Sequence, residues 1–472
     1  MLIDATLAFD VADEPAVTMS RCSKSPDHEA VVLALASSAD EEARARALQV
    51  LSQGPVDSSG RYLHWSDLRH RTPPEGLQLV EWWAGTRMAR QRAGVYLPLR
   101  GFGSEPFWLC QHNAMSSRLH WLDMHAAGAM TGEPYLADAA VRRRYLMRNL
   151  VEEAISSSQL EGASTTTVDA KAMIASGRAP NSLDERMIFN NYRAIQRVRE
   201  IRNEPMSLDL VFELHRIVTH DTLEQDDMAG RFRNAPVYVS DRRRSETVHE
   251  PPPSSELHER MQELFDFANR EPTKPHEFTH PLIRAIALHF MIGWIHPFVD
   301  GNGRTARALF YWSMSRSNYW LVEYLSISAA LKKAPIKYMH TYVKTESDGN
   351  DLTYFVDHQL GVLEDSIARL HRWIERRTGE TRATLALLEG ESELRGILNL
   401  RQSLLLRHAL DHPDETFTIV GHMARHQVTH QTARKDLMQL SDELELLVRY
   451  KSGRQFHFRT PTDLNERIER FR

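Results

Sequence analysis

The twelve residues from His296 to Arg307 gather several side chains that can do chemistry. They read His-Pro-Phe-Val-Asp-Gly-Asn-Gly-Arg-Thr-Ala-Arg. The imidazole of His296 can accept a proton near neutral pH. The carboxylate of Asp300 is a hard oxygen ligand of the kind that Mg²⁺ takes when it also holds substrate phosphates. A base and a carboxylate in so short a run favour proton transfer beside a phosphate.

The rest of the run can hold an anion. Gly301 and Gly303 allow backbone angles that other residues resist, and they let a ligand approach the main chain. Successive N–H groups around Asn302, opening into a helix, form an anion-binding nest. Arg304 and Arg307 add permanent charge in a forked shape that suits phosphate oxygens. Each feature alone has an ordinary structural explanation, but their conjunction at this spacing indicates a phosphate-handling site.

Two helices are expected to position this loop. Residues 280–295 are apolar nearly all round, which predicts a fully buried helix, and Pro281 suits its first turn. The apolar residues that follow Thr305 predict a second buried helix. The chemistry is therefore expected in a loop held between two rigid core helices.

The run resembles the signature of Fic-domain proteins, His-x-Phe-x-Asp/Glu-Gly-Asn-Gly-Arg-x-x-Arg, and it has a matching residue at every fixed position. The resemblance extends over residues 140–360, about half of the chain. Members of this family mostly transfer AMP from ATP to a Ser, Thr or Tyr hydroxyl of a target protein and release pyrophosphate. The resemblance therefore implies a protein adenylyltransferase that uses ATP as substrate and Mg²⁺ as cofactor.

The same resemblance implies a role for each residue of the run. His296 would be the general base, and Asp300 would hold Mg²⁺ against the α- and β-phosphates. The main chain from Gly301 to Gly303, with Asn302, would cradle the α-phosphate where charge develops in the transition state. The outer phosphates would be bound by Arg304 and Arg307.

A second motif lies upstream, at Ser157-Ser158-Gln159-Leu160-Glu161-Gly162. It resembles the inhibitory motif of the same family, Ser/Thr-x-x-x-Glu-Gly/Asn. A carboxylate at Glu161 that reached Arg307 would compete with the γ-phosphate for one guanidinium, because the two pairs are geometrically alike. The ordinary alternative is a glutamate at a helix end followed by a glycine cap. Ser157 and Glu161 thus predict a self-inhibited enzyme whose inhibitory helix precedes the catalytic loop.

A short hairpin is expected between these two motifs. The run Val237-Tyr238-Val239-Ser240 precedes charged turn residues and then prolines at 251–253, which predicts an exposed β-hairpin. The resemblance implies that this hairpin is the family's flap, which docks a target protein by strand addition. It also places Tyr338 near the adenine, although tyrosines on such helices are more often packing residues.

Composition excludes several classes of protein. With 42% hydrophobic and 26% charged residues the chain reads as soluble and globular, and a net charge of -5 gives no overall attraction to nucleic acid. Two cysteines, Cys22 and Cys110, do not make a disulfide framework. No stretch approaches the ~20 apolar residues of a membrane span. We therefore expect a cytoplasmic protein without membrane contact, and leave open whether it forms a homodimer.

The predicted fold is mainly α: a Fic-type helical core with the short hairpin flap, plus a C-terminal winged-helix domain. Four parts are expected along the 472 residues. Residues 1–60 form a variable segment and residues 61–140 an aromatic-rich module. Residues 141–378 form the catalytic domain with its inhibitory helix, and residues 385–472 form the winged helix-turn-helix.

Residues 385–472 could bind either DNA or another protein. Residues 428–437 predict a turn and a recognition helix, and residues 446–458 predict the wing. DNA could then be contacted by the polar side chains of His430, Gln431, Arg434 and Lys435. Acidic residues at 442–445 instead favour a protein-docking platform, and sequence leaves both open.

Other functions use the same features. Glu161 could orient a water for removal of AMP from a modified protein at the same site. The chain could also be a DNA-binding regulator whose catalytic domain senses nucleotide. A zinc-protease motif, His276-Glu277-Phe278-Thr279-His280, is a chance match, because Pro281 disfavours the helix that would place both histidines on one face.

Overall fold

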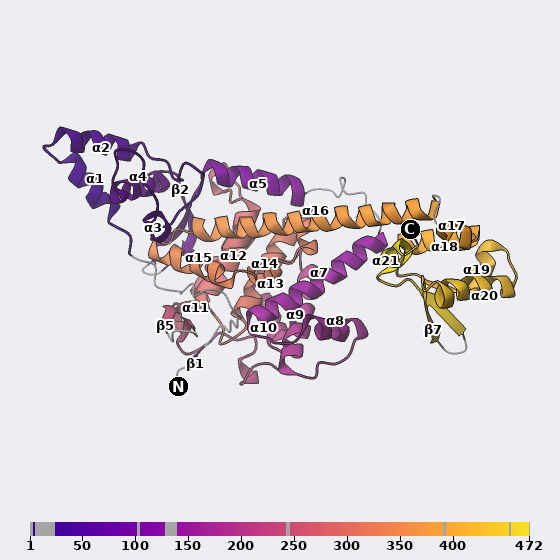
Figure 1. Cartoon of the computed structure of the whole chain (residues 1–472). Coiled ribbons are helices and arrows are strands. Elements are labelled where there is room, and N and C mark those ends of the chain that lie inside the picture. Colours follow the sequence, from indigo (N-terminus) through magenta and orange to yellow (C-terminus); the bar gives the residue numbers. More distant parts are fainter. Residues whose placement is uncertain are drawn as a thin grey trace. The chain divides into compact units, whose positions relative to one another are not determined.

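The computed structural model describes residues 3–4, 24–101, 104–127, 139–241, 246–389, 393–452 and 455–471. Over these residues the fold is mainly α-helical with three small sheets, as the sequence predicts (Figure 1). The chain forms two compact units. One comprises Met1–Gly128 and Met147–Ile367, and the other comprises Ala129–Leu146 and Ala368–Arg472.

These units differ from the four ranges predicted from the sequence. The aromatic-rich residues up to 128 belong to the same unit as the catalytic core. The second unit begins at Ala368, ahead of the predicted boundary at residue 385, because helix α16 (Thr353–Glu389) runs on without a break. Helix α7 (Ala139–Leu160) likewise contributes to both units.

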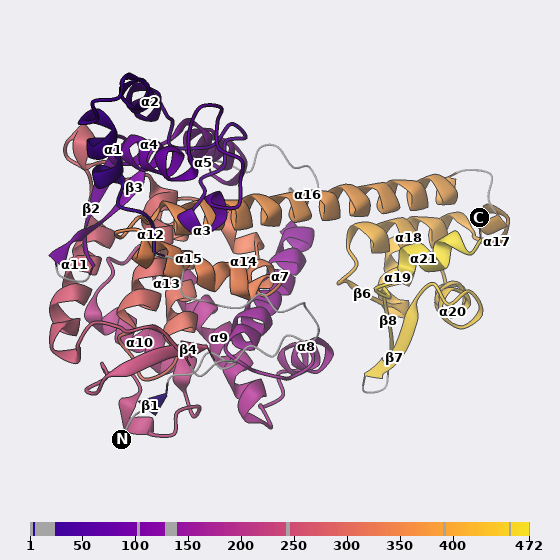
Figure 2. The same cartoon turned by 60° about the vertical axis from the view of Figure 1, so that its left-hand side comes forward.

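The first unit is built on two core helices that pack on each other, α12 (Pro281–Ile295) and α13 (Asn302–Arg316) (Figure 2). Helix α12 is buried on nearly every side, which explains its uniformly apolar sequence. It ends at His296, whose φ of 49° is left-handed, and α13 starts after Gly301, whose φ is 80°. The predicted pair of helices and the loop between them are confirmed.

Other helices enclose this pair. Helices α9 and α10 pack on α13, and α11 packs on α12. The enclosing elements of this unit are α8 (Thr167–Ser176), α9 (Leu183–Glu200), α10 (Leu208–Thr219), η2 (Asp226–Met228), η3 (Ser254–Glu256), α11 (Leu257–Asn269), η4 (Pro275–Glu277), η5 (Trp320–Tyr324), α14 (Ile327–Leu331) and α15 (Pro335–Ser347). The zinc-protease match falls on η4 and on His280, the N-cap of α12, so its pentad is not one helix.

The predicted hairpin is present. Strand β4 (Val237–Asp241) pairs antiparallel with β5 (Glu246–His249), with an irregularity between Val239 and Ser240. The predicted turn at 242–245 lies outside the described residues. On its other edge β4 pairs in parallel with β1 (Ile3–Asp4), so the sheet order is β1-β4-β5. The predicted site of strand addition is therefore already occupied on one edge by the chain itself.

The N-terminal part of the first unit is joined to the core by buried polar groups. Arg90 is fully buried, with its Cζ 3.7 Å from the ring centre of Tyr62. It donates to the carbonyls of Pro55 and Leu63 and to the Tyr354 hydroxyl, each at 2.9 Å. The bond to Tyr354 on α16 connects the aromatic module to the core. Its elements are α1 (His28–Ala36), α2 (Glu41–Leu51), α3 (Trp65–Leu68), α4 (Leu79–Arg92), β2 (Gly94–Arg100), β3 (Pro106–Cys110) and α5 (Asn113–Ala126).

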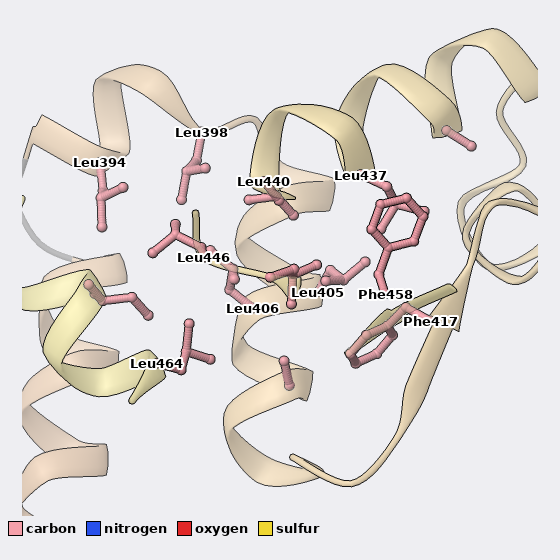
Figure 3. Close-up of a cluster of buried hydrophobic side chains, with 14 of the residues drawn as sticks. Leu394, Leu398, Leu405, Leu406, Phe417, Leu437, Leu440, Leu446, Phe458 and Leu464 are labelled. Atoms are coloured by element: carbon pink, nitrogen blue, oxygen red, sulfur yellow. The ribbon is translucent and has the colours of Figure 1, made fainter. Parts of the chain in front are cut away.

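The second unit has the predicted winged-helix order. Its elements are α17 (Glu393–Ile397), α18 (Leu400–Asp411), β6 (Thr416–Thr418), α19 (Ile419–His426), α20 (His430–Met438), η6 (Gln439–Glu443), β7 (Val448–Ser452), β8 (Gln455–Arg459) and α21 (Leu464–Glu469). The strands form one antiparallel sheet in the order β6-β8-β7. Figure 3 shows its leucine-rich core, to which helices and strands both contribute.

Buried Asp436 fixes the recognition helix α20 within that unit. Its carboxylate accepts hydrogen bonds from Asn399 at 2.7 Å and from Arg401 at 2.8 Å, and it lies 3.2 Å from His422 Nε2. The three partners lie on or beside α18 and α19. None of the helices described in either unit is long and apolar enough to cross a membrane.

Gly85 marks the closest approach of two helices in the N-terminal part. A Cβ at this position would overlap the Val50 carbonyl oxygen and would lie 2.7 Å from Gln53 Cγ. We expect Gly85→Ala to destabilise the fold by about 1–3 kcal/mol, because overpacking forces the backbone apart. Denaturant unfolding followed by tryptophan fluorescence measures this. Gly54→Ala is the control, since its nearest contact would be an ordinary 3.8 Å; equal stability of both variants would contradict the packing.

Candidate active site

The imidazole of His296 is held in one tautomer. It is 7% exposed at the end of α12, and its Nδ1 lies 3.1 Å from the Gly293 carbonyl oxygen. A carbonyl only accepts, so Nδ1 carries the proton and Nε2 keeps its lone pair. Burial lowers the pKa of His296 to about 4, which leaves the ring neutral at pH 7. His296 is thus an oriented, uncharged base.

The loop after His296 is braced internally. The Asn302 side chain accepts from the Phe298 N–H and donates to the Phe298 carbonyl, both at 2.9 Å. Its amide is therefore used to close the loop, which leaves the main chain for an anion. Phe298 is fully buried and stacks on His215 with ring centres 3.7 Å apart.

His215 on α10 joins two loops, a role that the sequence did not reveal. Its Nδ1 accepts from the Gly230 N–H at 2.8 Å, so the proton of the neutral ring lies on Nε2. Nε2 then donates to the Asp300 carbonyl at 2.9 Å. Burial lowers the pKa of His215 to about 4, which keeps this tautomer at neutral pH.

Arg233 is a second support that sequence reasoning missed. Its Nε donates to the His296 carbonyl at 2.8 Å, and its backbone N–H donates to the Pro297 carbonyl at 2.9 Å. Burial lowers its pKa to about 10. Arg233 thus satisfies carbonyls at the C-terminus of α12 and holds the backbone of His296 in place.

The N-terminus of α13 lies beside this base. Gly301 takes the left-handed conformation that begins the helix, and the Thr305 N–H closes the first helical bond to the Gly301 carbonyl. The N–H groups of residues 302–304 form the first turn, where a helix has no internal acceptors. Such a turn with its positive dipole end binds anions. The predicted nest therefore lies at a real helix terminus.

The two arginines of the run point to different places. Arg304 is fully buried and donates to the Val218 carbonyl at 2.9 Å and to Asp300 Oδ2 at 3.0 Å. This geometry favours a structural role that orients Asp300, whereas a phosphate contact for Arg304 stays a prediction. The Asp300 side chain is 52% exposed, so a cation can reach it.

Arg307 is buried and meets the upstream motif. Its Nε donates to Ser157 Oγ at 2.7 Å, and its Nη2 donates to the Ser157 carbonyl at 2.9 Å. The same Nη2 donates to Glu161 Oε1 at 2.8 Å, with the two side chains 3% and 8% exposed. The structure thus brings together Ser157, Glu161 and Arg307, as the sequence predicts.

Gly303 shows where the Glu161 carboxylate lies. A Cβ at residue 303 would overlap Glu161 Oε1 and would lie 3.1 Å from Arg307 Nη1. The carboxylate therefore sits against the second residue of α13, at the positive end of that helix. Glu161 thus lies against both Gly303 and Arg307, two residues of the predicted phosphate site.

The other residues predicted to belong to the site are Tyr338 and those of the hairpin. Tyr338 on α15 is buried and its hydroxyl lies 2.9 Å from His289 Nε2, which favours packing; its adenine contact stays a prediction. The hairpin is tied to the site by His249 of β5, whose Nε2 donates to the Trp294 carbonyl of α12 at 2.7 Å. Target docking by Val237, Tyr238, Val239 and Ser240 also stays a prediction.

Part of the chain is similar in sequence to known proteins. Residues 205–314 match the family model described as Fic/DOC family. Over 137 residues the chain is 34% identical to "Protein adenylyltransferase Fic" of Nematostella vectensis, which covers 29% of this chain and 28% of that protein. Over 195 residues it is 29% identical to the protein of the same name from Drosophila grimshawi, covering 39% of this chain and 36% of that one. The matches thus span less than two fifths of these relatives.

Solved structures of similar description exist. A Fic family protein from Desulfovibrio desulfuricans G20 has a TM-score of 0.48 at 18% identity, covering 74% of this chain and 95% of that chain. Fic-1 from C. elegans (aa134 - 508) has a TM-score of 0.42 at 22% identity, covering 56% of this chain and 72% of that chain.

His215 offers a test of the loop supports. We expect His215→Phe to keep the stack on Phe298 but to leave the Gly230 N–H and the Asp300 carbonyl without their partner. Two buried groups that lose hydrogen bonds cost about 2–4 kcal/mol in the free energy of unfolding. Denaturant unfolding of the full chain measures this. His258→Phe, at an exposed position, is the matched control. An equal effect of both changes on the free energy of unfolding would contradict a supporting role for His215.

Proposed function

We propose that this chain, whose residues 205–314 form a Fic/DOC-family domain, is a protein adenylyltransferase. It transfers AMP from ATP to a Ser, Thr or Tyr hydroxyl of a target protein. The hydroxyl oxygen bonds to the α-phosphorus, the bond from that phosphorus to the bridging oxygen of the β-phosphate breaks, and pyrophosphate leaves. The observation that carries the proposal is an oriented neutral base, His296, beside the anion-binding N-terminus of α13.

His296 accepts the proton of the attacking hydroxyl. Its Nδ1–H is engaged by Gly293, so only Nε2 can take that proton. The depressed pKa keeps the acceptor form present throughout the neutral range. The Gly293 carbonyl then stabilises the charged ring by accepting from Nδ1.

The helix terminus and Asp300 suit a nucleotide with a divalent cation. The first-turn N–H groups of α13 stabilise the charge that builds on the α-phosphate. Asp300 presents a half-exposed carboxylate oriented by Arg304, and Mg²⁺ favours one or two carboxylates together with substrate phosphates. Asp300 would hold the ion, which when bound neutralises charge on the phosphates.

Glu161 keeps the enzyme inactive at rest. Its carboxylate holds Arg307 and covers Gly303, so the γ-phosphate of ATP finds neither the guanidinium nor the space beside it. ATP bound without that contact has its α-phosphate misplaced for attack by the target hydroxyl. Release of Glu161 from Arg307 is then the activating event.

The hairpin β4–β5 is the proposed docking site for the target. Its β5 strand is fastened to the end of α12 through His249, which places a docked segment close to His296. Because β1 already pairs with β4, a target strand would have to displace Ile3–Asp4 or use the outer edge of β5, which pairs with no other strand among the described residues. We also propose a cytosolic location, which the lack of enough cysteines for a disulfide framework supports.

Removal of Glu161 tests this function. We expect Glu161→Gly to incorporate at least about tenfold more AMP into itself or into a target, because loss of one buried charge-assisted pair shifts the balance by that order. Incubation with α-labelled ATP and Mg²⁺, followed by mass spectrometry, measures the product.

Two variants make the result interpretable. His296→Ala in the Glu161→Gly background must abolish labelling if His296 is the base. Equal labelling by the wild type and by Glu161→Gly would contradict self-inhibition. Faster removal of AMP from a modified protein by the wild type than by Glu161→Gly would instead show that Glu161 orients a hydrolytic water.

A second function is supported for the C-terminal unit. The predicted contact residues His430, Gln431, Arg434 and Lys435 are all exposed on α20, while buried Asp436 holds that helix in place. An exposed recognition helix with paired cations on a rigid support is suited to phosphate and base contacts in a DNA groove. We propose that this unit binds DNA, with protein docking as the alternative.

We expect Arg434→Ala/Lys435→Ala to weaken binding of the full chain to genomic DNA fragments by about tenfold or more, because each lost phosphate contact removes counterion release. A mobility-shift assay at fixed salt measures it. Arg202→Ala/Lys274→Ala, at exposed positions in the first unit, removes the same charge and should leave binding unchanged. Absence of any shift by the wild type would favour protein docking.

A further inference from the structure

Glu153 is a buried carboxylate on the same helix as the inhibitory motif. It is 3% exposed and lies on α7, four residues before Ser157 and eight before Glu161. Glu153 and Ser157 share one face of α7 and are both buried, and Glu161 directly follows Leu160, the last residue of that helix. The chemistry proposed above does not use Glu153.

The carboxylate of Glu153 is held by a single turn. It accepts from Ser326 Oγ at 2.8 Å, from the Ser328 N–H at 3.0 Å and from Ser328 Oγ at 2.5 Å. Ser326 is also the N-cap of α14, where its side chain accepts from the Ala329 N–H. The three donors converge on the carboxylate from a segment that is itself part of a capped helix.

That turn is fastened to the helix that carries Arg307. The Ile327 N–H donates to the Tyr311 hydroxyl at 3.1 Å, and this hydroxyl donates to the Leu325 carbonyl at 3.1 Å. Tyr311 lies on α13, one turn after Arg307. Through this chain of bonds, Glu153 ties α7 to α13 at a second point, and its carboxylate also lies close enough to interact electrostatically with Arg307.

The surroundings of Glu153 on α7 include polar contacts as well as apolar side chains. A cavity borders this part of the helix, lined by residues that include Asn149, Leu150, Glu153, Ile195, Tyr311 and Leu325. Burial raises the pKa of Glu153, and the Ser328 and Ser326 bonds oppose that rise. Burying a carboxylate costs free energy of desolvation. Hydrogen bonds to it are directional, however, and therefore specify the register of a helix more strictly than apolar contacts do.

We infer that Glu153 is the positioning residue of the inhibitory helix. Its bonds to Ser326 and Ser328 hold α7 in the rotation and register at which Ser157 and Glu161 reach Arg307. This inference rests on the proposed self-inhibition. It predicts that a substitution at Glu153, which contacts neither ATP nor His296, releases the contact between Glu161 and Arg307.

The test is Glu153→Gln in the full-length chain. Glutamine has nearly the same shape as glutamate. Its NH₂ group, however, is a donor, and it would face the donors of Ser326 or Ser328 from which the carboxylate accepts. We expect labelling from α-labelled ATP to rise about tenfold over the wild type, the change in population that loss of one charge-assisted bond produces. Ser328→Ala, which removes one donor from the other side, should also raise labelling.

Glu152→Gln is the matched control, because Glu152 neighbours Glu153 on the same helix and is only partly buried. It should label like the wild type. In the Glu161→Gly background, Glu153→Gln should add nothing, since the contact it positions is already gone. A gain of activity is a readout that a mere loss of stability would not produce.

The outcomes separate the two proposals. If Glu161→Gly shows no gain over the wild type, self-inhibition itself fails. If Glu161→Gly gains activity while Glu153→Gln does not, only the positioning role is overturned. A fall in labelling when Glu153→Gln is added to Glu161→Gly would also overturn it, because Glu153 would then serve the catalytic core instead of the inhibitory contact.

Discussion

The buried guanidinium of Arg307 is the group on which the rest of the site depends. A charge removed from water needs a partner of opposite charge close by, since leaving it alone costs several kcal/mol. In this structure the partner is Glu161, with Ser157 taking the remaining bonds. An arrangement of this kind favours either an internal carboxylate or an external phosphate, but not an empty site.

The groups that do chemistry are kept apart from the groups that regulate it. The loop after His296 is held by three side chains that donate hydrogen bonds to its backbone carbonyls, those of Asn302, His215 and Arg233. None of these bonds involves Arg307. Under the proposed self-inhibition, the base would need no rearrangement when Glu161 leaves. Only the attachment of α7 would have to change, and a small displacement of one helix would suffice, because a hydrogen bond is lost within about an ångström.

The sequence predicted several parts of the fold and of the candidate site. The apolar run 280–295, the glycines around Asn302 and the spacing of Arg304 and Arg307 predicted two core helices with an anion site between them. The upstream motif predicted Glu161 beside Arg307, and the C-terminal patterns predicted a winged-helix order. The four predicted domain ranges stay a prediction; the division into two compact units instead falls within the unbroken helix α16, and Arg90 of the aromatic module hydrogen-bonds to Tyr354 of the core.

The sequence by itself determined which groups are chemically able to act, because a residue's type decides what it can ionise, donate or accept. Tertiary structure alone decided how those groups are divided between catalysis and support. Arg304 and Arg307 look alike in the chain, yet one is buried against Asp300 and Val218 and the other faces Glu161. His215 and Glu153 carry no local motif, since His215 bonds to Asp300, 85 residues away, and Glu153 bonds to Ser326 and Ser328, 173 and 175 residues away. Such roles arise from burial and from contacts between distant segments, which local sequence patterns do not encode.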